Sequence, residues 1–203
     1  MQGTEACQFL EKNQWVSNVV FAGSGDGAWR FLTDISPDGH RMICELGFAE
    51  FSRRLVALLP PELRGEGRVE FRRVPGLALE NRPQEEEGAI TGILSLLSGP
   101  GLHRLLLRVG AEAVYFQGHF PGNPILPGIA QLHWAAGMTM KLFGFKEVPF
   151  EVKRLKFRNI IRPSSVIELV LEGKKRDEVE FVFAGAGVVH SSGCLCFKEE
   201  LTC

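Results

Sequence analysis

Residues 118–144, GHFPGNPILPGIAQLHWAAGMTMKLFG, decide how this chain is organised. The first part is a loop in which Pro121, Pro124 and Pro127 each fix the backbone angle φ at about −65°. Such a loop is stiff, so it can hold His119 in one place. Pro127 also suits the first position of a helix, and the second part of the stretch has the composition of a helix.

This predicted helix runs from Gly128 and ends at Gly144, a residue type common at helix C-termini. Apolar side chains occur on nearly every face, which is typical of a helix buried on all sides. They are Ile129, Leu132, Trp134, Ala135, Ala136, Met138, Met140 and Leu142. The first N–H groups of a helix have no partner within it and can bind an oxyanion. The sequence therefore predicts a site where the histidine loop meets the helix.

From residue 89 onward the pattern is otherwise that of strands. One buried helix among consecutive antiparallel strands predicts an α+β fold, in which a curved antiparallel sheet wraps around the central helix. The expected strands are residues 90–97, 103–109, 113–116, 150–157, 166–172, 179–185 and 188–197.

The stretch HFPGNPILPGIAQLHWA, residues 119–135, resembles the signature of the hotdog-fold 3-hydroxyacyl-thioester dehydratases of the FabZ type. It is most similar to the ApeI-like branch, which takes its name from aryl-polyene pathways. The segment KFRNIIRPSSVIEL, residues 156–169, resembles the same family. The resemblance implies a hotdog domain over residues 89–203 and a homodimer or higher homo-oligomer. It also implies an acyl group on the phosphopantetheine of acyl carrier protein or on CoA, and neither metal nor organic cofactor.

The resemblance also assigns roles to individual residues. The histidine of H-F-P-G is the family's catalytic base, and that position is His119. The family's acid lies on the helix, fourteen positions later, where this chain has His133 instead of a carboxylic acid. His133 could donate a proton as an imidazolium ion, or it could be an inert, hydrogen-bonded residue in a buried helix. The Gly128 N–H would bind the thioester oxygen. Gln131 and Trp134 could line the acyl tunnel, with core packing as the alternative for Trp134.

Residues 1–83 form a separate small α/β extension in this interpretation. Their pattern predicts a short helix, a hairpin of two strands, a turn at Ser36–Gly39, a helix over residues 48–59 and a strand over residues 69–74. This order, with FRRVPGLALENRPQ at residues 71–84, resembles the C-terminal subdomain of acyl-adenylate-forming synthetases. The nucleotide-contacting lysine of those enzymes is missing from residues 80–85, so the resemblance implies a remnant without adenylation chemistry. An unrelated α/β extension is the alternative, and residues 84–88 are expected to be a linker.

The composition excludes several classes of function. A formal net charge of −1 gives no electrostatic reason to expect binding of nucleic acid or of an anionic membrane. No apolar run approaches the ~18 residues of a membrane span, and the first residues lack the features of a signal peptide. We therefore expect a cytoplasmic protein. Its five cysteines are expected to be free thiols rather than ligands of a metal.

Together these features predict the dehydration of (3R)-hydroxyacyl thioesters, carried on acyl carrier protein, to trans-2-enoyl thioesters in fatty acid or aryl-polyene-type biosynthesis. A histidine is a suitable base for such chemistry, since its unperturbed pKa is about 6.5. Two alternatives remain open. The chain could be a hotdog thioesterase, or a catalytically lapsed subunit that binds acyl groups or acts as a scaffold.

Overall fold

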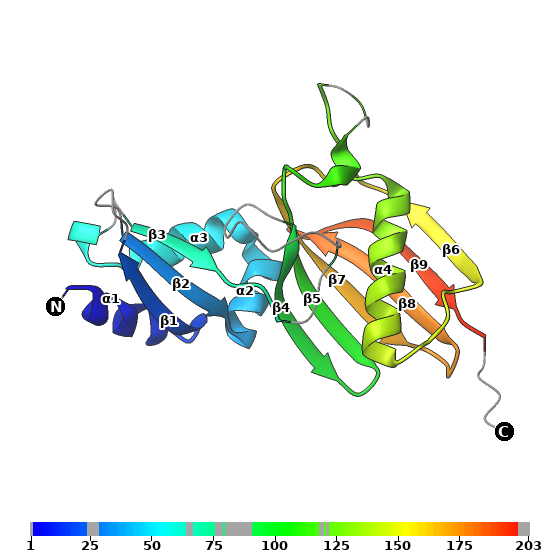
Figure 1. The fold of residues 1–203 in the computed structure, drawn as a ribbon, viewed down its shortest axis with the longest axis horizontal. Coiled ribbons are helices and arrows are strands. Elements are labelled where there is room, and N and C mark those ends of the chain that lie inside the picture. The colour runs from blue at the N-terminus through cyan, green and yellow to red at the C-terminus, as the bar shows by residue number, and fades with distance from the viewer. Residues whose placement is uncertain are drawn as a thin grey trace.

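The computed structural model describes residues 2–23, 29–63, 67–75, 79, 91–117, 120 and 122–198. Two β-sheets organise these residues, one of three strands and one of six (Figure 1). The three-stranded sheet belongs to the N-terminal extension. The six-stranded sheet, called the large sheet below, belongs to the rest of the chain.

The extension surrounds its sheet with helices. Strand β1 (Val16–Gly23) pairs antiparallel with β2 (Trp29–Ile35), and β2 pairs parallel with β3 (Gly67–Phe71). The expected hairpin and the last predicted strand are therefore confirmed. The helices are α1 (Gln2–Glu11), α2 (Pro37–Leu46), α3 (Phe48–Ala57) and the short 3₁₀ helix η1 (Pro61–Leu63).

The turn predicted at Ser36–Gly39 is wrong, because these residues begin α2. The Ser36 Oγ accepts a 3.1 Å hydrogen bond from the Gly39 N–H, and Pro37 occupies the first helical position. Serine followed by proline and aspartate suits both a turn and a helix start. The amphipathic residues that follow decide in favour of the helix.

The large sheet is antiparallel throughout, in the strand order β4-β5-β7-β8-β9-β6. Its strands correspond closely to those expected. They are β4 (Gly92–Gly99), β5 (Leu102–Val109), β6 (Glu151–Phe157), β7 (Ser165–Gly173), β8 (Glu178–Gly185) and β9 (Val188–Cys196). Residues Val114–Phe116, expected to be a strand, instead form the 3₁₀ helix η2 between β5 and the histidine loop.

Helix α4 (Gly128–Phe143) lies across one face of this sheet, which we call the inner face (Figure 1). Gly144 ends the helix in the left-handed conformation, with φ of 80°, a conformation that glycine adopts at little cost. Side chains from α4 and the inner face form a continuous apolar core. Its fully buried members include Trp134, Phe181 and Phe183. A curved antiparallel sheet around a central helix is the predicted hotdog fold.

Burial of α4 on all sides, however, is wrong for the single chain. Trp134 is 1% exposed, whereas Ile129, one of the apolar residues expected to be buried, is 71% exposed. One face of the sheet therefore does not cover all the apolar side chains of α4. An uncovered apolar surface of this kind is typical of an interface.

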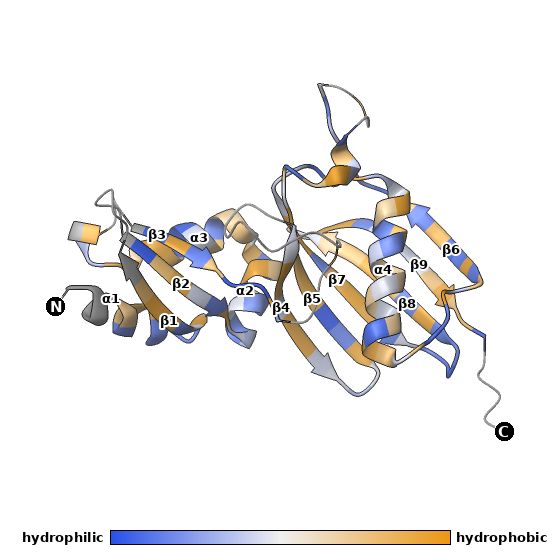
Figure 2. Ribbon diagram, in the orientation of Figure 1, coloured by the Kyte–Doolittle hydropathy of each residue, from blue (hydrophilic) through white to orange (hydrophobic). Residues whose placement is uncertain are grey.

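The extension covers part of the opposite, outer face of the large sheet. Leu94 of β4 and Leu106 of β5 belong to the same apolar core as Phe31, Phe51 and Leu55 of the extension. Figure 2 shows hydrophobic segments in strands of both sheets. After β3, the Val74 N–H donates to the Ile93 carbonyl at 2.7 Å, which joins the extension to strand β4.

The division at residues 83 and 89 stays a prediction, since the expected linker 84–88 lies outside the described residues. The same is true of residues 80–85, where the synthetases carry their lysine. Among the helices of the described residues, none is long and apolar enough to cross a membrane.

Candidate active site

The loop before α4 is fixed where the structure describes it. The Leu126 N–H donates to the Ile161 carbonyl at 2.8 Å, and Leu126 itself is buried. Arg162 donates a hydrogen bond to the Asn123 side chain. These contacts attach the loop to the segment between β6 and β7. His119 itself lies outside the described residues, so its role stays a prediction.

Gly128 begins α4 directly beneath an aromatic ring. A Cβ atom at this position would lie 2.5 Å from Phe157 Cζ and within 2.9 Å of both Cε atoms of the ring. Real Cβ contacts are never so short, so glycine is required as long as the ring stays in place. Among the described residues no side chain caps this helix end. Its first N–H groups are therefore available to a ligand oxygen.

Gln131 ties three elements together from the first turn of α4. Its amide oxygen accepts a 2.6 Å hydrogen bond from Ser191 Oγ on β9. Its Nε2 donates to the Leu126 carbonyl at 3.2 Å, in the loop before the helix. Because Gln131 is only 3% exposed, both bonds are shielded from water. The residue has a clear structural task, and its expected place in a tunnel lining stays a prediction.

Trp134 lies in the core, as its alternative interpretation predicted. It meets Tyr115 edge to face, with ring centroids 5.7 Å apart. The indole Nε1 is buried and has no hydrogen-bond partner among the described residues. A contribution of this indole to a tunnel lining also stays a prediction.

His133 faces away from the sheet and is exposed. The interpretation of His133 as a hydrogen-bonded residue inside a fully buried helix is therefore wrong for the single chain. Gly128, Gln131, His133 and Trp134 lie within two turns of α4, but only Gln131 and Trp134 face the core. The exposed face of α4 carries Ile129 together with His133.

Sequence reasoning overlooked two residues of this region. Phe157 lies within the family-like K-F-R segment, which marked its position but not its contact with Gly128. Ser191 had no comparable signal, since a serine on a strand does not reveal a partner 60 residues away.

Comparison with known proteins agrees with this architecture. The family model described as ApeI-like, ApeI dehydratase, matches residues 100–194. The 3-hydroxyacyl-[acyl-carrier-protein] dehydratase FabZ of Oenococcus oeni is 35% identical over 112 residues, which cover 50% of this chain and 78% of that protein. The FabZ of Latilactobacillus sakei subsp. sakei is 40% identical over 103 residues, covering 47% and 71%.

Among solved structures, the dehydratase heterocomplex ApeI:P from Xenorhabdus doucetiae aligns with a TM-score of 0.49 and 20% identity, over 53% of this chain and 96% of the other.

The sheet and α4 define a hotdog-fold protein. With the identities and coverage found for the two FabZ proteins, the chain belongs to the FabZ-type family of 3-hydroxyacyl-[acyl-carrier-protein] dehydratases. These matches leave about half of the chain, including most of the extension, outside the similarity.

Proposed function

We propose that this protein dehydrates (3R)-hydroxyacyl thioesters carried on acyl carrier protein and releases trans-2-enoyl thioesters. One observation carries the proposal: in a FabZ-family chain, the H-F-P-G motif is followed by helix α4, whose start at Gly128 is not capped by any side chain of the described residues. If His119 acts as the base, as the family motif implies, the first N–H groups of α4 would supply the oxyanion donor of the same site.

The reaction assigns one task to each residue. His119 removes the proton from C2 of the acyl chain, while the Gly128 N–H stabilises the negative charge that develops on the thioester oxygen. The C2 electron pair forms the double bond to C3 as the C3–O bond breaks. His133, as imidazolium, donates its proton to the departing hydroxyl, and water leaves. No metal or organic cofactor is needed for these steps.

The exposed face of α4 supports a homodimer in which the site is shared. In the isolated chain His133 and Ile129 face outward, and apolar residues continue this exposed surface onto and around β6. The exposed apolar residues there are Val148, Phe150, Leu155, Phe157 and Ile160. A second copy would cover this surface and remove water from around His133.

The direct test measures two possible reactions of one thioester: hydration of its enoyl double bond and hydrolysis of its thioester bond. Hydration of crotonyl-CoA by the purified protein should lower the enoyl absorbance without release of free thiol, and His119→Ala should abolish the reaction. His103→Ala is the matched control, because His103 packs against Phe143 at the opposite end of α4. Release of thiol with the enoyl group intact would instead identify a thioesterase.

The replacement of the family acid by His133 favours a second candidate, a subunit that binds acyl thioesters without turning them over. It predicts that wild-type protein binds crotonyl-CoA in calorimetry but leaves the enoyl absorbance unchanged. Turnover that depends on His119 would exclude this candidate.

A further inference from the structure

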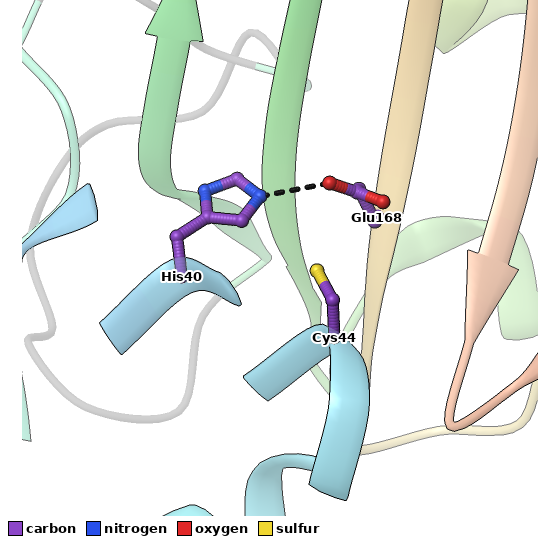
Figure 3. Close-up of side chains that lie close together, drawn as sticks. All are labelled: His40, Cys44 and Glu168. Atoms are coloured by element: carbon purple, nitrogen blue, oxygen red, sulfur yellow. Dashed lines mark hydrogen bonds and ion pairs between the residues drawn. The ribbon is translucent and has the colours of Figure 1, made fainter. Parts of the chain in front are cut away.

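A cluster of polar side chains lies between the extension and the outer face of the large sheet. His40 and Cys44 come from α2, four residues apart, and therefore lie on the same side of that helix. Glu168 comes from β7 (Figure 3). The possible ligand atoms of the three residues all lie within 4.8 Å of one another.

This cluster is separate from the candidate active site. Ile167 and Leu169, the neighbours of Glu168 on β7, belong to the core beneath α4. Successive side chains of a strand point to opposite faces, so Glu168 projects to the outer face of the sheet. His40 and Cys44 reach that face from the extension.

His40 and Glu168 are both buried and held in position by hydrogen bonds. His40 is 1% exposed and Glu168 is 7% exposed. The His40 Nδ1 lies 3.0 Å from Ser95 Oγ, and its Nε2 lies 2.9 Å from Glu168 Oε1. Arg104 donates from Nε to Glu168 Oε1 at 2.7 Å and from Nη2 to Oε2 at 2.9 Å, which fixes the carboxylate plane.

We propose that His40, Cys44 and Glu168 bind one divalent transition-metal ion, with Zn²⁺ as the best match, and that this ion fastens the extension to the large sheet. Imidazole nitrogen, thiolate sulfur and carboxylate oxygen are the three ligand types that zinc uses in proteins. Because the ligands come from α2 and β7, the ion would cross-link two parts of the chain 124 residues apart.

The hydrogen-bond partners suit both the empty and the occupied site. In the empty site, the tautomer with its proton on Nε2 would donate to Glu168 and would accept from the Ser95 hydroxyl at Nδ1. With an ion bound, the neutral imidazole takes the other tautomer, so that Nε2 presents its lone pair to the ion and Nδ1–H donates to Ser95 Oγ. A hydroxyl can serve in both directions, as ligand-orienting partners of metal-bound histidines do.

The charges are also compatible with a divalent ion. Cys44 binds an ion as a thiolate, so its thiol proton leaves when the ion binds. The resulting thiolate and the Glu168 carboxylate together balance the two charges of the ion. The positive charge of Arg104 is left over, but this side chain is 45% exposed and its charge is therefore solvated.

Cobalt provides a direct test, because a Co²⁺–thiolate bond produces a charge-transfer band in the near ultraviolet. Chelator-treated full-length protein should develop this band with one equivalent of Co²⁺, and Zn²⁺ should displace it. Cys44→Ser should remove the band, and Ser95→Ala should weaken the affinity ~10–100-fold, as is typical of outer-shell partners. Cys7→Ser, which removes another free thiol of the extension, is the matched control and should keep the charge-transfer band.

The same samples give a readout of stability. An ion that binds the folded state raises the melting temperature, so Zn²⁺ should stabilise wild type and Cys7→Ser but not Cys44→Ser. Far-ultraviolet circular dichroism checks that the near-isosteric serine variant is folded. No thiolate band in wild type at excess Co²⁺, or a band that survives Cys44→Ser, would overturn the proposal and leave a purely hydrogen-bonded cluster.

Discussion

The ring of Phe157 covers Gly128 so closely that a Cβ atom on the glycine would lie 2.5 Å from the ring. The ring is itself 51% exposed, so it can turn outward when something else needs the space above Gly128. In the proposed reaction that space belongs to the thioester oxygen. The contact therefore links the packing of β6 to access to the helix N-terminus.

Gly128→Ala should fold but lose activity. Alanine favours the helix and the exposed ring can move aside, so we expect the unfolding free energy to change by less than about 1 kcal/mol. The new methyl group would nevertheless occupy the place of the thioester. Activity should fall ~10²–10³-fold, the usual cost of losing an oxyanion donor. The measurement is the rate of crotonyl-CoA hydration together with urea unfolding.

The double variant Gly128→Ala/Phe157→Leu separates two explanations of that loss. If the displaced ring blocks the site, the smaller leucine should restore activity. If the methyl group itself excludes the thioester, activity should stay low, which is the outcome we expect.

The hydrogen bond between Ser191 and Gln131 should contribute measurably to stability. Gln131→Leu leaves the Ser191 hydroxyl and the Leu126 carbonyl buried without this partner, at a cost of about 1–3 kcal/mol. A double-mutant cycle with Ser191→Ala, followed by chemical denaturation, isolates the coupling between the two side chains. A loss in the double variant that is smaller than the sum of the two single losses would agree with a direct bond, whereas strictly additive losses would contradict it.

The extension and the sheet should depend on each other through Leu106. In the full chain Leu106 is 1% exposed within the shared core, so Leu106→Ala should cost about 2–5 kcal/mol. Removal of residues 1–83 would uncover Leu106 and Leu94, and the shortened protein should aggregate. Leu106→Lys should then improve the solubility of the shortened protein while it destabilises the full chain. Light scattering measures the solubility of the shortened protein, and thermal unfolding measures the stability of the full chain. If Leu106→Lys raised both quantities or lowered both, a shared core would be excluded.

The uncovered face of α4 should be a subunit interface. Sedimentation of wild type should give about twice the 22.5 kDa of one chain, or a higher multiple. Ile129→Glu should dissociate the assembly, because it places a charge in an apolar contact. Val188→Glu, at another exposed apolar position, should leave the mass unchanged. A wild-type mass of one chain would count against a shared site.

The hotdog fold could be predicted because local signals and the family-like motif agreed. The apolar residues of α4 and the strand-like segments around it identified the elements, and Pro127 and Gly144 fixed the helix ends. The start of α2 at Ser36 was missed, since the same residue types also form turns. Partners distant in sequence could not be predicted: the His40 and Cys44 spacing is visible along α2, but only the folded chain brings Glu168 beside them. Likewise, residues 129–142 looked buried on all sides in the single chain, because a sequence does not show how many separate surfaces cover a helix.

The most informative substitution tests the histidine that replaces the family's acid. If His133 donates the proton to the leaving hydroxyl, His133→Leu should lower the hydration rate by ~10²–10⁴-fold, the usual contribution of a positioned acid. Because His133 is exposed in the single chain, this change should barely affect folding, so a loss of activity can be assigned to chemistry. His133→Glu restores the residue type of the family and should retain or raise the rate. If wild type is inactive and His133→Glu gains turnover that depends on His119, the protein is a lapsed dehydratase. If His133→Leu matches wild type, the proton comes from another group and the proposed pair of histidines is wrong.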